Sequence, residues 1–387
     1  MIEVLPYRIS NKEHRPSKRL VVVFSSYLLN HQVSSGSFTF YKLFSLSPEN
    51  SDILFVRDPL NCWYLEKIES LDLKTLSVES LIEKREIVKS SASGLTRILE
   101  ILQADYSYVT FFGSSMGGYG ALLYAYKVSP HQVVALCPQT FHARGYPRFK
   151  PCHHKYIFSD LAQLNYAETK TKLHLLVGAE NLYDIYHATR INSFMANLTL
   201  VPRTCHNVPL YFHRLGRFQQ LIDSVVDGSF ESYLEKLRSQ YKKFQTLQPY
   251  LDSSKIYGVL EGLFYNIYID KDVQFAEALL TAIIERFPWH AGARRSLGLL
   301  WYEQNFEDTR IPKILTDALN DVYLMDDGYG PLSHSLAYHG KVDEAIDWLQ
   351  KGLKLNKAAV IQYIGCVCES LPKDATKERD ILQNLQS

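Results

Sequence analysis

Short, continuously apolar runs alternate with amphipathic stretches over roughly the first 228 residues. Runs in which nearly every position is apolar are typical of strands buried on both faces. They occur at residues 19–24, 53–56, 108–112, 132–137, 173–177 and 198–201. Helical periodicity lies between them, most clearly at 40–46, about 77–102, 116–128 and around 215–222, after an irregular or edge-strand lead-in at 1–18. Strands that alternate with helices predict an α/β fold with a doubly wound, mainly parallel sheet and right-handed crossovers.

The pattern changes after about residue 228, where amphipathic helices replace the apolar runs. Residues 340–355 resemble the second half of a tetratricopeptide repeat, and residues 275–301 fit the same template. Ala276 and Ala345 are 69 residues apart, close to two periods of about 34 residues. We therefore expect two domains, 1–228 and 229–387, the second with three to four helical hairpins. An unrelated helical bundle is the alternative.

Charge and composition exclude several classes of function. Forty-two Lys and Arg against 41 Asp and Glu give a net charge of +1, so global charge favours neither a nucleic acid nor a membrane surface. No apolar run approaches the ~20 residues of a membrane span. No secretory signal is visible, and the six cysteines show no disulfide spacing. These features predict reduced thiols and a cytoplasmic protein.

Metal and cofactor motifs are weak in this sequence. The run Cys152-His153-His154 and the pair Cys366 and Cys368 lack the paired spacing of a zinc site. We therefore expect no metal site and no resident cofactor.

Gly113-x-Ser115-x-Gly117 joins the run at 108–112 to a helix rich in small residues. A strand, a tight glycine-flanked turn and a helix together form the context of a nucleophile elbow. Ser115 is then the nucleophile, lifted above the carboxyl end of the sheet. Met116 opens the helix, so its N–H can stabilise an oxyanion. The alternative is a Ser115 that only caps the helix.

A serine nucleophile needs a base and an orienting acid, which in α/β hydrolases follow it in the order acid, then histidine. His206 lies just beyond the last predicted strand and is the candidate base; His213, further along, is the weaker rival. The acid is expected after the strand at 173–177. Asp184 is preferred there over Glu180, although Asp184 can also be a plain helix cap. Asn181 occupies the position where the acid commonly lies.

Other candidates lie at the carboxyl ends of the first strands, where doubly wound sheets bind ligands. The second oxyanion donor is expected after the strand at 19–24, from the backbone N–H of Ser26 or Tyr27. Arg57, Asp58 and Trp63 follow the next strand and, together with Tyr27, can line a substrate pocket. A turn closed by Asp58 and the next proline explains these residues equally well.

The segment 141–155 is basic and aromatic, and it includes His142 and Arg144. Such a segment can receive an anionic partner, for example a phosphorylated acyl donor or an acidic glycan. A solvated loop of mixed polarity is the simpler interpretation.

Residues 19–225 resemble the α/β-hydrolase superfamily, with a small cap in place of a full lid domain. The elbow at 113–120, the strand end at 22–26 and the stretch 55–64 are similar to bacterial glycan-modifying members, which include accessory-secretion proteins and capsule O-acetyltransferases. The resemblance implies a Ser115–Asp184–His206 triad and an acyl-serine intermediate. It also implies acetyl-CoA as an acyl-donor substrate and a glycan acceptor. The C-terminal repeats depart from that pattern.

Two further functions remain open from the sequence. The same triad serves a carboxylesterase or deacetylase if water rather than a sugar hydroxyl resolves the acyl-enzyme. A non-catalytic scaffold would instead bind protein partners through its helical repeats.

Overall fold

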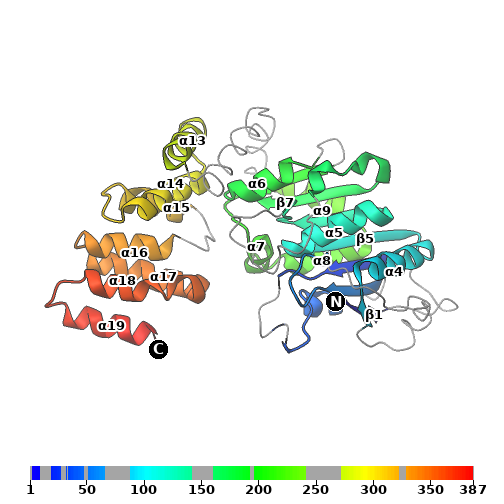
Figure 1. Cartoon of the computed structure of the whole chain (residues 1–387), viewed down its shortest axis with the longest axis horizontal. Helices are drawn as coiled ribbons and strands as arrows, with labels where there is room; N and C mark the ends of the chain where they lie inside the picture. Colours follow the sequence, from blue (N-terminus) through cyan, green and yellow to red (C-terminus); the bar gives the residue numbers. More distant parts are fainter. Residues whose placement is uncertain are drawn as a thin grey trace. The chain divides into compact units, whose positions relative to one another are not determined.

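The computed structural model describes residues 2–8, 19–27, 32, 34–47, 51–65, 88–141, 160–191, 196–240, 272–321 and 328–386 (Figure 1). By their internal contacts these residues form two units. The sheet unit comprises Met1–Val177, Asp184–Val201 and Val208–Ser253, and the helical unit comprises Gly178–Tyr183, Pro202–Asn207 and Ser254–Ser387. Each unit is described by itself below.

An eight-stranded sheet, in the order β4-β1-β3-β2-β5-β6-β7-β8, forms the centre of the sheet unit. Its strands are β1 (Ile2–Arg8), β2 (Arg19–Phe24), β3 (Asp52–Arg57), β4 (Val88–Ser90), β5 (Tyr108–Ser114), β6 (Gln132–Leu136), β7 (Lys172–Gly178) and β8 (Ala196–Val201). The pairs from β3 through β7 are parallel, whereas β1 runs antiparallel to both its neighbours. The mainly parallel sheet that the apolar runs predict is therefore confirmed.

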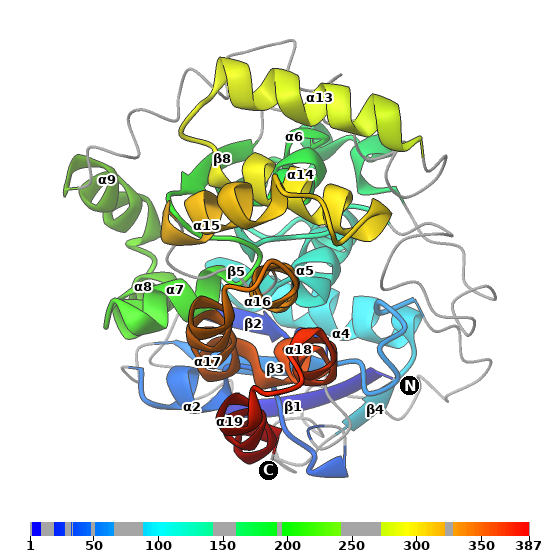
Figure 2. The ribbon, with the colours of Figure 1, turned by 90° about the vertical axis from the view of Figure 1, so that its left-hand side faces the viewer.

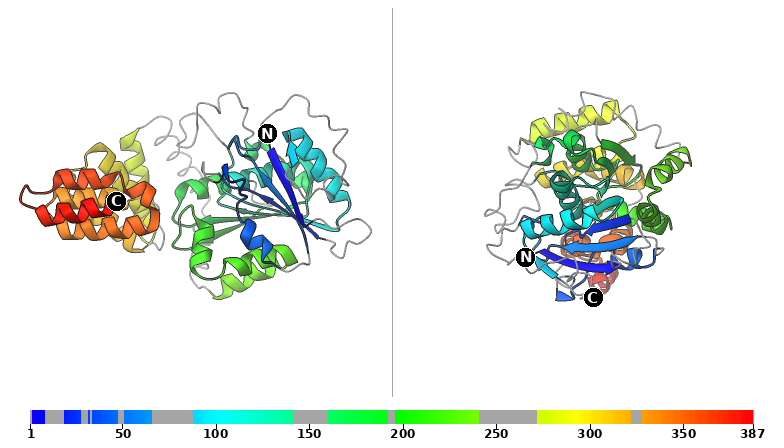
Figure 3. Two further views of the ribbon diagram at one scale, coloured as in Figure 1. Left: turned by 90° about the horizontal axis from the view of Figure 1, so that it is seen from below. Right: turned by 90° about the vertical axis from the view of Figure 1, so that its right-hand side faces the viewer.

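Helices cover both faces of this sheet, because alternate residues of the central strands point to opposite sides. Val21 and Val23 of β2 join a core with α2 (Tyr41–Ser45), α7 (Val208–Arg214), α8 (Phe218–Asp227) and α9 (Phe230–Gln240). On the other face lie α4 (Ala92–Ala104) and α5 (Met116–Val128), which contact each other and the sheet (Figure 3). The short α6 (Leu182–Thr189) follows β7.

Two local expectations are wrong. The periodicity at 77–102 predicts one helix, but Val88–Ser90 form β4, which pairs with β1. The helix α4 begins at Ala92, because Ser91 caps its N-terminus: the Ser91 hydroxyl accepts the Gly94 N–H at 3.0 Å. The strand β1 is not an edge strand, because it lies between β4 and β3.

The helical unit consists of antiparallel helices that pack mainly against their neighbours in sequence. They are α13 (Val273–Arg286), α14 (Ala291–Gln304), α15 (Ile311–Asp321), α16 (Tyr329–Tyr338), α17 (Val342–Val360), α18 (Tyr363–Ser370) and α19 (Thr376–Gln386) (Figure 2). Ala345, a predicted small packing position, is fully buried in their core. The helix-rich C-terminal region is thus confirmed.

The units do not divide the chain at residue 228. The helix α9 groups with the sheet, and two short loops after β7 and β8 group with the helices. No helix among the described residues has the length and hydropathy of a membrane span.

Candidate active site

Ser115 lies at the sharp turn between β5 and α5, and its backbone is strained. Its φ of 54° and ψ of −118° fall in a region of backbone conformation that residues other than glycine rarely adopt. A Cβ on Gly113 would lie 2.2 Å from the carbonyl oxygen of Gly117, and a Cβ on Gly117 would lie 2.3 Å from that of Phe24. The glycines are therefore required, because the turn is tight against its own backbone and against the end of β2.

The neighbours of Ser115 hold its backbone in this strained state. Its N–H donates to the carbonyl of Leu136 at 2.8 Å, and the hydroxyl of Ser26 donates to the carbonyl of Ser114 at 2.9 Å. Met116 is the first residue of α5, so its N–H belongs to the first turn, whose amides have no partner within the helix. Only 7% of Ser115 is exposed, so the hydroxyl is recessed rather than prominent.

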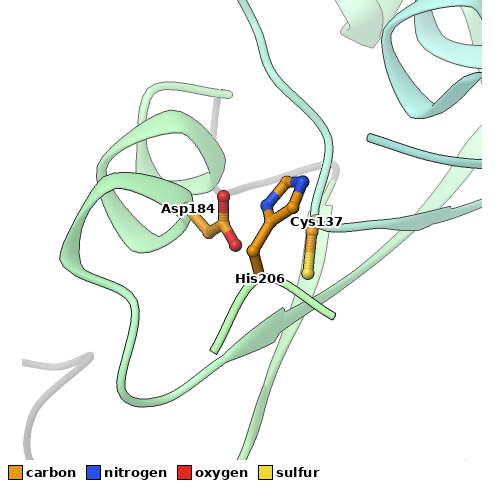
Figure 4. A group of neighbouring side chains, drawn as sticks. All are labelled: Cys137, Asp184 and His206. Atoms are coloured by element: carbon orange, nitrogen blue, oxygen red, sulfur yellow. The ribbon is translucent and has the colours of Figure 1, made fainter. Parts of the chain in front are cut away.

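An acid and an imidazole meet at the carboxyl ends of the following strands. Asp184 lies in the first turn of α6, and His206 lies in the loop between β8 and α7. A carboxylate oxygen of Asp184, an imidazole nitrogen of His206 and the sulfur of Cys137 all lie within 4.8 Å of one another (Figure 4). We call these three residues the acid–base group.

Cys137 is the member of the acid–base group that the sequence did not single out. It follows β6 directly, is fully buried and has a φ of 45°. Its position at the carboxyl end of a central parallel strand is the signal that could have found it. Sulfur, nitrogen and carboxylate oxygen are also the ligands that zinc prefers, so chelation needs a direct test.

Glu180, the rival acid, has other partners. Its carboxylate accepts the N–H of Gly292 at 3.0 Å, and only 4% of the residue is exposed. Asn181 accepts the Tyr183 N–H at 3.1 Å, and His213 lies within the last turn of α7. This arrangement favours Asp184 as the partner of His206, and the role of Asp184 stays a prediction.

The predicted second oxyanion donor is engaged elsewhere. The Ser26 N–H donates to the hydroxyl of Thr39 at 3.2 Å. To stabilise an oxyanion, this amide would have to exchange that bond, so its role stays a prediction. Tyr27, the alternative, is half-buried at the same loop.

Arg57, Asp58 and Trp63 are buried in structural networks, which does not fit an open substrate pocket. Arg57 pairs with Glu3, donating from Nε at 2.6 Å, and its Nη1 donates to the Ser37 carbonyl at 3.1 Å. Trp63 is 1% exposed and packs edge-on against an aromatic ring of α5. Their burial favours a structural role, and the expectation that these three residues line a pocket stays a prediction.

Asp58 organises the turn that follows β3. Its carboxylate accepts the Leu60 N–H at 3.2 Å and the Tyr64 N–H at 2.9 Å. Burial raises the pKa of this carboxyl, and the backbone donors partly oppose the shift. The hydroxyl of Tyr64 in turn donates to the carbonyl of Ser25 at 2.6 Å, which stabilises the end of β2 beside the elbow.

The predicted residues His142 and Arg144 lie outside the described residues.

These features together are those of an α/β-hydrolase fold: a central parallel sheet, an elbow after β5, an acid after β7 and a histidine after β8. The order of candidates along the chain, Ser115, Asp184 and His206, is also that of the fold.

No family model matches the sequence, and no curated protein matches it. Among solved structures, an α/β serine hydrolase homologue from Coxiella burnetii is 14% identical, with a TM-score of 0.32 over 59% of this chain and 91% of its own. The capsule O-acetyltransferase of Neisseria meningitidis serogroup A is 15% identical, with a TM-score of 0.32 over 57% and 91%. A protein from Capnocytophaga ochracea is 12% identical, with a TM-score of 0.28 over 95% and 94%. The function proposed below is supported by the geometry of the site and not by these likenesses.

Proposed function

We propose that this chain is a serine-nucleophile enzyme that works on acyl esters through an acyl-Ser115 intermediate. The observation that carries the proposal is the strained backbone of Ser115 at the β5–α5 turn, which the close glycine packing makes obligatory. Strain of this kind persists only where the surrounding structure enforces it, and it gathers at reactive sites. The proximity of Asp184 and His206 supports the same conclusion.

In the acylation step, an imidazole nitrogen of His206 takes the proton of the Ser115 hydroxyl as its oxygen attacks the acyl carbonyl carbon. The carbonyl oxygen becomes an oxyanion, and the Met116 N–H donates to it. When the tetrahedral intermediate collapses, the bond to the leaving group breaks. The imidazolium then returns its proton to the leaving thiolate or alkoxide, and Asp184 stabilises the imidazolium throughout.

In the second step, an acceptor hydroxyl loses its proton to His206 and attacks the acyl carbon, which releases Ser115. We propose O-acetyl transfer to a glycan, of the bacterial surface type, with acetyl-CoA as the acyl-donor substrate. The recessed position of Ser115 supports transfer over hydrolysis, because limited water access protects an acyl-enzyme. If water resolves the intermediate, the enzyme is a carboxylesterase or deacetylase.

Labelling with a fluorophosphonate probe tests the nucleophile. We expect one adduct on Ser115, found by mass spectrometry, that S115A abolishes and H206A slows by about a hundredfold or more. S114A is the matched control, because it removes the neighbouring hydroxyl at the variable position of the turn, from a residue that is similarly buried. An unlabelled wild type would support the scaffold interpretation, in which the helices bind protein partners.

The acceptor is tested by incubating the chain with acetyl-CoA and candidate glycans. Appearance of an acetylated glycan that depends on Ser115 supports transfer. Loss of acetyl-CoA with release of acetate and no acetylated glycan would identify a hydrolase instead.

A further inference from the structure

The two loops that lead into the acid and the base belong to the helical unit. Residues 178–183 end one position before Asp184, and residues 202–207 contain His206. The loops are bonded to each other, because the Glu180 N–H donates to the Thr204 carbonyl at 3.0 Å. The position of one loop therefore fixes the position of the other.

Glu180 attaches the first loop to the N-terminus of α14. Its Oε2 accepts the Gly292 N–H at 3.0 Å, at the helix end where unpaired amides favour an acceptor. The contact also includes backbone, since a Cβ on Gly292 would lie 1.8 Å from the Glu180 carbonyl oxygen. No side chain fits between α14 and this loop.

The contact between Glu180 and His290 is not an ion pair. The His290 Nδ1 accepts the Ala293 N–H at 3.0 Å, and it lies 3.4 Å from the Glu180 Oε2. Burial lowers the pKa of His290 to about 3 and raises the pKa of Glu180 to about 7. The imidazole is therefore neutral, and below neutral pH the carboxyl keeps its proton.

The second loop is attached independently. Cys205, which precedes His206, is 2% exposed and lies in the core of the helical unit with Ala291 and Ile311. The Arg203 Nε donates to the Asp321 carbonyl at the end of α15, at 2.8 Å. Residues of α14 and α15 thus pack against the loop at Cys205, and the end of α15 also bonds it at Arg203.

We propose that Glu180 and Gly292 are positioning residues, through which the N-terminus of α14 fixes the two loops of the helical unit and so sets the orientation of the His206 imidazole. The proposal rests on the proposed function, because it assigns these residues a part in the reaction of Ser115.

The test uses the full chain and two readouts: the rate of fluorophosphonate labelling, and the ¹H–¹³C signal of the His206 imidazole, assigned with H206N. G292A inserts a methyl group at the crowded contact. G365A is the matched control, because Gly365 lies in α18 with nothing within 4 Å of its Cβ position. E180A and E180Q form a second pair that separates loss of the hydrogen bonds from loss of the charge.

We expect G292A and E180A to slow labelling about tenfold or more and to shift the His206 signal, with circular dichroism unchanged. G365A and E180Q are expected to behave like the wild type, since Gln retains an acceptor for Gly292. Folded G292A and E180A with wild-type labelling and an unshifted His206 signal would overturn the proposal. If wild-type Ser115 is inert, the proposed function fails, and the His206 signal alone decides whether α14 positions the imidazole.

Discussion

Replacing Glu180 with Gln removes a buried titrating group while keeping its shape, and so changes how the stability of the helical unit depends on pH. Burial raises the pKa of this carboxyl from 4.5 to about 7. The folded chain then holds the proton more tightly than the unfolded chain. The contribution to stability is full below pH 4.5 and is lost as the pH rises through 7.

The size of the loss follows from that pKa. Moving a carboxyl from 4.5 to about 7 corresponds to roughly 3 kcal/mol of unfolding free energy. His290 acts in the opposite direction, because its lowered pKa costs stability as the pH falls from 6.5 to about 3. Because His290 is present in both E180Q and the wild type, its effect cancels when their unfolding free energies are subtracted. We therefore expect the stability of E180Q relative to the wild type to rise by roughly 3 kcal/mol between pH 4.5 and pH 8.

Urea unfolding followed by tryptophan fluorescence measures this difference. Three of the four tryptophans, Trp289, Trp301 and Trp348, lie in the helical unit, so the signal reports mainly on it. E344Q is the control. It removes the same negative charge as E180Q, but from an exposed side chain. A relative stability of E180Q that stays constant within about 0.5 kcal/mol over this pH range would refute the assignment of a buried, protonated Glu180.

Three other predictions concern the sheet unit and the acid–base group. G117A is expected to destabilise the chain by about 3 kcal/mol or more, because its Cβ would overlap the Phe24 carbonyl; a folded G117A of wild-type stability in urea contradicts the tight elbow. Y64F is expected to cost about 1–2 kcal/mol by leaving the buried Ser25 carbonyl without this donor, and an unchanged thermal midpoint would count against that bond. Treatment with EDTA is expected to leave fluorophosphonate labelling unchanged, because a serine–histidine–acid reaction needs no metal. Loss of labelling that zinc restores would assign the acid–base group to a metal instead.

Much of the sheet was predictable because its strands are buried on both faces. Runs such as residues 19–24 and 132–136 are apolar at every position after the first, and no solvent-facing pattern competes with that interpretation. The strand β4 was missed because residues 77–102 have helical periodicity throughout. Pairing with β1, more than 80 positions away in the sequence, decides the conformation of Val88–Ser90.

The elbow and the candidate acid and base followed from local sequence and from chain order, so Ser115, Asp184 and His206 could be named. The roles of Arg57 and Glu180 could not, because each depends on a distant partner. Glu3 precedes Arg57 by 54 positions, and Gly292 follows Glu180 by 112. A charged residue at a strand end looks the same in the sequence whether it faces a ligand or a buried counterpart.

The helical unit is assembled from three separate pieces of chain, two of which are short loops between strands. During synthesis these loops leave the ribosome long before the helices that complete their core. Cys205 consequently has none of its C-terminal neighbours, such as Ala291 and Ile311, until most of the remaining chain has been made. Domains generally fold as units from the N-terminus during translation. Here the last step of maturation is expected to be the closing of that core, so that the loop bearing His206 becomes ordered only when the polypeptide is nearly complete.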